Sequence, residues 1–304
     1  MTLLDRGIAR LLPIVPRPVV RRLSSPYIAG PALEDAVRVV RRLNVDGKLA
    51  TVDVLGEEIT NAGEAREIAR QYHQVLARIE SEGLDANISV KLTGLGLEVD
   101  HDLCRANLEA VVEDARVRGN FVRIDMEDSS TTDATLRFYR ELRTAGREDV
   151  GVVLQACLRR TLGDVPGLAN VRLCKGIYVE PPEIAYHDPD EIRASFLATL
   201  DALLAEAAYV GIATHDELLI RESLLRTQAL GLAHDEFEFQ MLLGVRPGRG
   251  DELIRDGHRL RVYVPFGRHW YEYSIRRLQE NPRIAGYVAA DAMRRLLPLR
   301  PGQG

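Results

Sequence analysis

The choice of fold depends on Leu49-Ala50-Thr51-Val52-Asp53-Val54-Leu55-Gly56-Glu57-Glu58. The first seven of these residues are mostly apolar and end at a glycine, which predicts a short buried strand. An open α/β sheet that binds a dinucleotide carries a glycine-rich phosphate loop directly after its first strand. Residues 55–58 do not have that pattern, and no G-x-G-x-x-G or P-loop occurs elsewhere in the chain. The stretch therefore favours a closed barrel over an open sheet.

Seven more apolar runs of strand length follow along the chain. They predict strands at residues 87–92, 121–126, 150–156, 170–174, 210–214, 236–242 and 260–264. Helical periodicity predicts helices at residues 32–43, 62–82, 103–118, 134–145, 189–210, 217–229 and 270–281. Strands that alternate with helices indicate a parallel sheet. Right-handed crossovers close eight such strands into a (β/α)8 TIM barrel.

The composition excludes several classes of protein. The 304 residues carry a net charge of −5, which gives no general attraction to nucleic acid. Three scattered cysteines support neither a disulfide scaffold nor a zinc cluster, so a reducing cytoplasmic setting is expected. Because no repeat or linker interrupts the chain, we expect one domain over residues 1–304. Residues 1–48 form its N-terminal helical extension.

The first 14 residues alternate apolar side chains with Arg6 and Arg10. A signal peptide has a longer uninterrupted apolar run, so we predict a short amphipathic helix. Packing on the body of the protein is one interpretation, and peripheral contact with a membrane is the other. No apolar run in the chain reaches the roughly 18 residues that a membrane span needs.

Polar residues gather where the predicted strands end. Active sites of barrel enzymes lie at the carboxyl ends of the strands. The residues expected there are Asp53, Lys91, Asp125, Glu127, Gln155, Arg172, Lys175, Thr214, His215, Gln240 and Tyr263. Any one of them is equally well explained by a structural ion pair. So many buried polar groups are costly unless they are paired or bind a ligand, so together they predict a site.

Two lysines leave alternatives open. A strand-end lysine such as Lys91 or Lys175 suits a Schiff-base aldolase that needs no flavin. Lys175 also belongs to Arg172-Leu173-Cys174-Lys175-Gly176, where two cations suit phosphates and a glycine permits close approach of a ligand. A cofactor pyrophosphate held by side chains would explain the missing glycine-rich loop. Solvated charges at a strand end are the simpler explanation of the same motif.

The predicted last helix places Tyr273, Arg276, Arg277 and Glu280 on one face. Two guanidinium groups beside a phenol form a wall that suits a carboxylate, because arginine binds carboxylates bidentately. The alternative is a surface Arg276–Glu280 pair worth about 0.5 kcal/mol. The seven histidines have no H-E-x-x-H spacing, and no serine lies in a G-x-S-x-G motif, so we expect neither a metal site nor a serine hydrolase.

These motifs resemble the proline dehydrogenase family of flavin-dependent enzymes. The resemblance covers roughly residues 50–282 and rests on Leu55-Gly56-Glu57, Ser89-Val90-Lys91-Leu92-Thr93, Ile124-Asp125-Met126-Glu127, Leu154-Gln155-Ala156, Arg172-Leu173-Cys174-Lys175-Gly176-Ile177-Tyr178, Ala213-Thr214-His215-Asp216, Glu238-Phe239-Gln240-Met241-Leu242, Val262-Tyr263-Val264-Pro265-Phe266-Gly267 and residues 273–281. It implies a distorted barrel, with FAD at its mouth and the final helix over that mouth.

The resemblance also implies roles for individual residues. Catalytic residues would be Lys91, Asp125 and Tyr263. Proline would contact Lys91, Tyr263, Tyr273, Arg276 and Arg277. FAD would contact Asp125, Gln155, Arg172, Lys175, Gly176, Thr214, His215 and Glu280. Glu57 would pair with Arg276 as a gate that closes the site.

The implied reaction is oxidation of L-proline to Δ1-pyrroline-5-carboxylate by hydride transfer to flavin N5. A quinone would take the electrons, and pyrroline-5-carboxylate dehydrogenase is a conceivable partner. The protein would be cytoplasmic or peripheral at the inner face of the membrane. Three alternatives stay open: oxidation of hydroxyproline or another cyclic amino acid, the Schiff-base aldolase, and a non-catalytic flavin or amino-acid binding protein.

Overall fold

The computed structural model describes Val20 and residues 25–56, 59–271 and 273–275. Eight parallel strands form a closed barrel in chain order. They are β1 (Leu49–Val54), β2 (Ala86–Val90), β3 (Val122–Ile124), β4 (Val150–Gln155), β5 (Asn170–Cys174), β6 (Tyr209–Ala213), β7 (Phe237–Leu242) and β8 (Leu260–Phe266). Pairing of β1 with β8, in which Thr51 lies opposite Tyr263, closes the ring. The predicted (β/α)8 barrel is confirmed.

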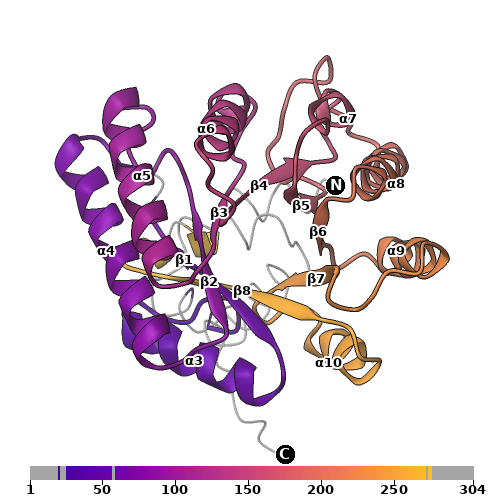
Figure 1. The fold of residues 1–304 in the computed structure, drawn as a ribbon, viewed down its shortest axis with the longest axis horizontal. Helices are drawn as coiled ribbons and strands as arrows, with labels where there is room; N and C mark the ends of the chain where they lie inside the picture. Colours follow the sequence, from indigo (N-terminus) through magenta and orange to yellow (C-terminus); the bar gives the residue numbers. More distant parts are fainter. Residues whose placement is uncertain (1–19, 21–24, 57–58, 272, 276–304) are drawn as a thin grey trace, which may run out of the picture.

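Helices surround the strands (Figure 1). The described helices are α3 (Leu33–Val45), α4 (Ala62–Ser81), α5 (His101–Val117), α6 (Thr132–Thr144), α7 (Thr161–Asp164), α8 (Pro189–Ala205), α9 (Glu217–Ala229) and α10 (Pro247–Arg255). Helix α3 lies within the predicted N-terminal extension, residues 1–48.

Two helices and one helix end differ from the prediction. Neither α7, a single turn, nor α10 was predicted, because Pro247, Gly248 and Gly250 conceal the periodicity of α10. Proline in the first turn is nevertheless a helix start signal. Helix α8 was predicted to run to residue 210 but ends at Ala205, because Ala207 adopts φ 54° and β6 begins at Tyr209.

The two faces of the barrel sheet differ in polarity. Apolar side chains such as Val52, Ile88 and Phe239 belong to the main hydrophobic core. The alternate positions carry polar groups, because successive side chains of a strand point to opposite faces. Arg172 on β5 donates to Ser89 Oγ on β2 at 3.1 Å. Since β5 and β2 are not neighbours, this bond crosses the barrel interior. The interior is therefore polar, and the core lies between the strands and the helices.

The start of the predicted final helix is described. Residues 270–271 and 273–275 are helical, and Tyr273 packs with Ile28, Leu55 and Trp270. The remainder of the predicted helix, with Arg276, Arg277 and Glu280, lies outside the described residues. So do Glu57 and the predicted amphipathic helix at residues 1–14. Within the described residues, no helix combines the length and the apolar character needed to cross a membrane.

Candidate active site

A cavity of about 620 Å³ opens at the carboxyl ends of the strands. Its lining includes every described residue to which the family resemblance implies a substrate, cofactor or catalytic role: Lys91, Asp125, Gln155, Arg172, Lys175, Gly176, Thr214, His215, Tyr263 and Tyr273. Of the other residues expected at the strand ends, Gln240 lines the cavity, whereas Asp53 and Glu127 do not. Strands β2 to β8 and the first turn of the final helix thus place polar groups around one space. The four predicted residues that lie outside the description, Glu57, Arg276, Arg277 and Glu280, stay predictions.

Lys91 follows β2 and lies in a buried set of partners. Its Nζ donates to Asp53 Oδ1 at 2.8 Å and to the Tyr263 hydroxyl at 3.1 Å. Asp125 Oδ2 lies 3.7 Å from the same nitrogen. Tyr72, which is buried on α4, donates to Asp53 Oδ1 at 3.3 Å. Two carboxylates beside one amine stabilise the charged ammonium form of Lys91.

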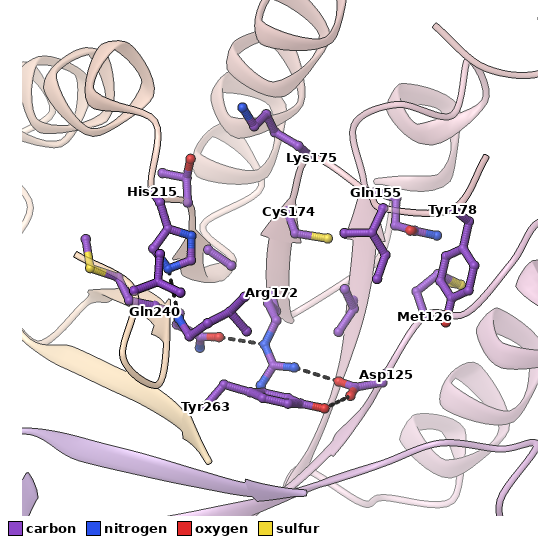
Figure 2. A pocket seen from close by; sticks show the side chains of 18 of the residues that line it. Asp125, Met126, Gln155, Arg172, Cys174, Lys175, Tyr178, His215, Gln240 and Tyr263 are labelled. Carbon is purple, nitrogen blue, oxygen red and sulfur yellow. Dashed lines mark hydrogen bonds and ion pairs between the residues drawn. The ribbon is translucent and has the colours of Figure 1, made fainter. Parts of the chain in front are cut away.

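Asp125 follows β3 and connects several strands. Its Oδ1 accepts bonds from Arg172 Nη1 at 2.6 Å and from Ser89 Oγ at 2.5 Å. Its Oδ2 accepts a bond from the Tyr263 hydroxyl at 2.8 Å. Figure 2 shows Arg172 and Tyr263 converging on this carboxylate. With three donors on two oxygens, Asp125 is held in place from β2, β5 and β8.

Tyr263 lies between charges of both signs. Burial raises its pKa well above the ordinary value of 10.0, and the nearby Asp125 and Asp53 carboxylates raise it further, against the opposing effect of Lys91 and Arg172. Its ring also lies 5.2 Å from the Arg172 guanidinium carbon, within cation–π range. The phenol therefore stays neutral, with its proton directed to Asp125.

The predicted cationic cluster on β5 is divided in the structure. Arg172 is 7% exposed and points into the barrel, whereas the Lys175 side chain is 40% exposed and lies at the rim. The two side chains extend in opposite directions (Figure 2). Lys175 Nζ pairs with Asp216 Oδ2 at 3.0 Å, and Arg193 Nε reaches the same oxygen at 2.8 Å. Of these two cations, Lys175 lines the cavity and could face an anionic group there.

Two further contacts fix polar groups in the wall. Gln155 donates from Nε2 to the Glu127 carbonyl at 2.8 Å. His215 Nε2 lies 2.9 Å from the backbone nitrogen of Leu242. Because a backbone N–H can only donate, this ring nitrogen is the acceptor, and neutral His215 carries its proton on Nδ1. Both side chains therefore have one defined orientation.

Gly176 leaves space in the wall beside Gln155. Its φ is 95°, and a Cβ there would lie 2.2 Å from Cys157 Sγ and 3.2 Å from Gln155 Cβ. The position therefore requires glycine for both its backbone and its surroundings.

Among the described residues, no three His, Cys, Asp or Glu side chains gather as a metal ligand set.

The structure adds residues to which the sequence assigned no role. Asp53 and Gln240 lie at predicted strand ends, and Ser89, Asp216 and Glu238 lie in the motifs that carry the family resemblance, but the sequence predicts no function for any of these five residues. For the four strand residues the signal is the alternation within a strand, for example Phe237, Glu238, Phe239 and Gln240, which turns every second residue into the barrel. For Asp216 the signal is its position as the N-cap of α9. What they contact depends on closure of the barrel, which no local pattern contains.

The comparisons with known proteins now decide the family. The profile of the family described as proline dehydrogenase matches residues 36–290. The chain belongs to the proline dehydrogenase family. Proline dehydrogenase 1 of Bacillus subtilis subsp. natto is 36% identical over 266 residues, which cover 86% of this chain and 88% of that protein. The proline dehydrogenase of Deinococcus radiodurans is 36% identical over 274 residues, 88% of each chain.

A solved structure of a larger protein shares the fold. Proline utilization A from Bdellovibrio bacteriovorus, inactivated by N-propargylglycine, matches with a TM-score of 0.79 at 23% sequence identity. The match covers 92% of this chain and 36% of the longer protein. Membership of the proline dehydrogenase family decides against the Schiff-base aldolase alternative. The ion pair between Lys91 and Asp53 agrees with that decision, because an aldolase nucleophile must be an uncharged amine.

Proposed function

We propose that this protein oxidises L-proline to Δ1-pyrroline-5-carboxylate with FAD as its cofactor. The observation that carries the proposal is the interlocked set of Lys91, Asp125 and Tyr263 in the mouth cavity of a chain that belongs to the proline dehydrogenase family. These three residues are the catalytic groups that the family resemblance implies, and they contact one another.

The cavity fits a flavin. Apolar side chains such as Met126, Val153 and Met241 line it, which suits a flat aromatic ring system. Gln155, Arg172 and Lys91 offer donors of the kind that hydrogen-bond the polar edge of such a ring. Gly176 supplies a wall without a side chain, and Lys175 offers a cation at the rim. We propose that FAD contacts Asp125, Gln155, Arg172, Lys175, Gly176, Thr214, His215 and Glu280.

We assign the carboxylate of proline to Arg276 and Arg277, which follow Tyr273 in the sequence of the predicted last helix. Two guanidinium forks would fix both the position and the orientation of the substrate. Tyr263 and Tyr273 would then border the proline ring. Glu57 would pair with Arg276 to close the site over the substrate.

The described residues position the reacting groups and stabilise charge, and we assign none of them to removing a proton. Asp125 accepts hydrogen bonds from Ser89, Arg172 and Tyr263, so we assign it to orienting Tyr263 and Arg172. Lys91 would stabilise the negative charge that reduction places on a bound flavin. When bound, FAD would supply the hydride acceptor. The amine of proline releases its proton to water before the δ-carbon gives up that hydride.

The remaining assignments follow the resemblance. A quinone would receive the electrons, and the unstable product would pass to pyrroline-5-carboxylate dehydrogenase. The protein would work in the cytoplasm or at the inner membrane face. We further propose that residues 1–304 fold as a single domain, with residues 1–48 as its extension.

A product assay tests this proposal. Purified protein is incubated with L-proline and an artificial electron acceptor, and the product is trapped with o-aminobenzaldehyde, which reacts with pyrroline carboxylates. L-Proline should give the coloured adduct and D-proline should not. The cofactor released by heating should elute as FAD in chromatography. Stronger turnover of hydroxyproline would replace the proposed substrate, and absence of any adduct would reject the activity.

A further inference from the structure

A chain of buried hydrogen bonds leads from the interior of the barrel to the site. Glu238 on β7 is 2% exposed. Its Oε1 accepts from Gln240 Nε2 at 2.6 Å and from Arg261 Nε at 2.7 Å. Gln240 Oε1 in turn accepts from Arg172 Nε at 2.6 Å. Arg172 then reaches Asp125, which is the partner of Tyr263.

The amide of Gln240 can take only one orientation in this chain. Arg172 Nε can only donate, so it must face the amide oxygen. An ionised Glu238 can only accept, so it must face the amide nitrogen. Burial raises the pKa of Glu238, but the charge of Arg261 and the hydrogen bonds from Arg261 and Gln240 outweigh burial and leave that pKa below its ordinary value. Glu238 is therefore ionised, and its charge defines how Gln240 presents its oxygen to Arg172.

The neighbouring strand leaves room for this arrangement. Arg172 on β5, Gly211 on β6 and Glu238 on β7 lie at one level, because Gly211 pairs with both others in register. A Cβ on Gly211 would lie 2.3 Å from Gln240 Nε2. The backbone of Gly211 is not left-handed, so the space rather than the conformation requires glycine here.

We propose that Glu238 is a positioning residue for proline oxidation, which acts through Gln240 to hold Arg172 in contact with Asp125. This inference rests on the proposed function. Without the charge of Glu238, the amide of Gln240 is free to turn its nitrogen toward Arg172, and Arg172 Nε loses a buried acceptor. The guanidinium then shifts, and Asp125 loses one of the donors that align it with Tyr263.

The first test observes Arg172 directly and needs neither proline nor turnover. In uniformly 15N-labelled protein, the Arg172 Nε–H resonance is assigned by its loss in Arg172→Lys. We expect hydrogen exchange of this group to be at least about tenfold faster in Glu238→Gln, which corresponds to about 1.4 kcal/mol. The matched control is Tyr209→Phe, which removes the 3.1 Å bond from Tyr209 to the other oxygen of Glu238 and leaves Gln240 untouched. Unchanged exchange in Glu238→Gln, or equal acceleration in both variants, would overturn the inference.

The second test uses the rate at which L-proline reduces the bound flavin at saturating substrate. Glu238→Gln and Gln240→Leu should each lower this rate about tenfold, and the double variant should be no slower than the slower single variant, because residues in one network are not additive. If the double variant lowers the flavin reduction rate by the product of the two single effects, Glu238 and Gln240 do not act through one path, and the inference fails. If proline does not reduce the wild-type flavin, the proposed function fails, while the exchange test on Arg172 still decides the positioning role.

A steric variant keeps the inference testable if Glu238→Gln does not fold. Gly211→Ala changes no charge but displaces the amide of Gln240, and it should lower the flavin reduction rate as Glu238→Gln does. Gly151→Ala is the matched control. A Cβ at this position would lie 2.3 Å from Nη1 of Arg123, another buried arginine. Arg123 donates its hydrogen bonds to Val152 and Asn170. Gly151→Ala should keep the wild-type rate. Equal loss of rate in the two alanine variants would refute the inference.

Discussion

Tyr263 on β8 donates its hydroxyl proton to Asp125 Oδ2 at 2.8 Å, although Asp125 follows β3 on a non-adjacent strand. The same oxygen of Tyr263 accepts from Lys91 at 3.1 Å. The phenol thereby connects a carboxylate with an ammonium, and it defines the distance between them. Residues far apart in the chain are coupled in this way only because the barrel closes.

Replacing Tyr263 with phenylalanine should slow the chemistry more than it affects folding. Tyr263→Phe removes one donor from Asp125 and one acceptor from Lys91 but keeps the ring. A hydrogen bond to a charged group is worth about 1.5–3 kcal/mol, so we expect flavin reduction by proline to slow about tenfold or more. Stopped-flow absorbance measures this rate. A Tyr263→Phe protein with the wild-type rate would remove the hydroxyl from the reaction.

Loss of Lys91 should be costly for stability. Lys91→Met leaves the buried Asp53 carboxylate without its cation, and breaking a buried pair costs about 3–5 kcal/mol. Lys48→Met is a suitable control, because Lys48 is equally buried but its partner Asp251 is 54% exposed and can be hydrated. Urea unfolding should show a much smaller loss for Lys48→Met. Similar losses of unfolding free energy in the two variants would show that the Lys91–Asp53 pair stabilises the fold no more than the pair with the exposed Asp251 does.

The stabilising effect of Glu238 should depend on pH. Its pKa is lower in the folded protein than the ordinary 4.5. A depressed carboxyl pKa contributes stability that is fully present above the unfolded-state pKa and is lost as the pH falls toward the folded-state pKa. The difference in unfolding free energy between the wild type and Glu238→Gln should therefore shrink as the pH falls below about 4.5. Urea unfolding at pH 7 and pH 4 measures it, and a constant difference would contradict the assignment.

Gly176 should be required for cofactor binding. Gly176→Ala places a methyl group against Cys157 Sγ in the cavity wall, in addition to backbone strain at φ 95°. Gly167→Ala carries comparable strain at φ 77° with no atom within 4 Å, and strain alone costs about 1 kcal/mol. We expect the flavin content after purification to fall only in Gly176→Ala. Full flavin content in that variant would place the cofactor elsewhere in the cavity.

The sequence predicted the strands well because each strand carries a short apolar run. The predicted fifth strand at residues 170–174 matches β5, and helix α9 also has its predicted bounds. Helix α10 was missed because Pro247 and two glycines lower its helix propensity within nine residues. Local patterns decide where an element forms when its apolar period is regular, and they fail where turn residues interrupt that period.

The site was predictable as a set of residues but not as a set of contacts. Strand ends identified Lys91, Asp125 and Tyr263, since barrel chemistry occurs at the carboxyl ends of strands. The separation of Arg172 from Lys175 could not be foreseen, because Arg172 points into the barrel from β5 whereas Lys175 lies just beyond the end of that strand, at the rim. The role of Asp53 as the partner of Lys91 likewise depends on the pairing of β1 with β2.

We propose that this barrel binds a flavin that proline reduces. The most direct measurement is the visible absorption spectrum of the purified protein, recorded without oxygen before and after addition of L-proline. We predict a yellow protein whose flavin absorbance bleaches on addition of L-proline and returns when an electron acceptor is supplied. A colourless protein that does not take up FAD, or a flavin spectrum that L-proline leaves unchanged, would contradict the account.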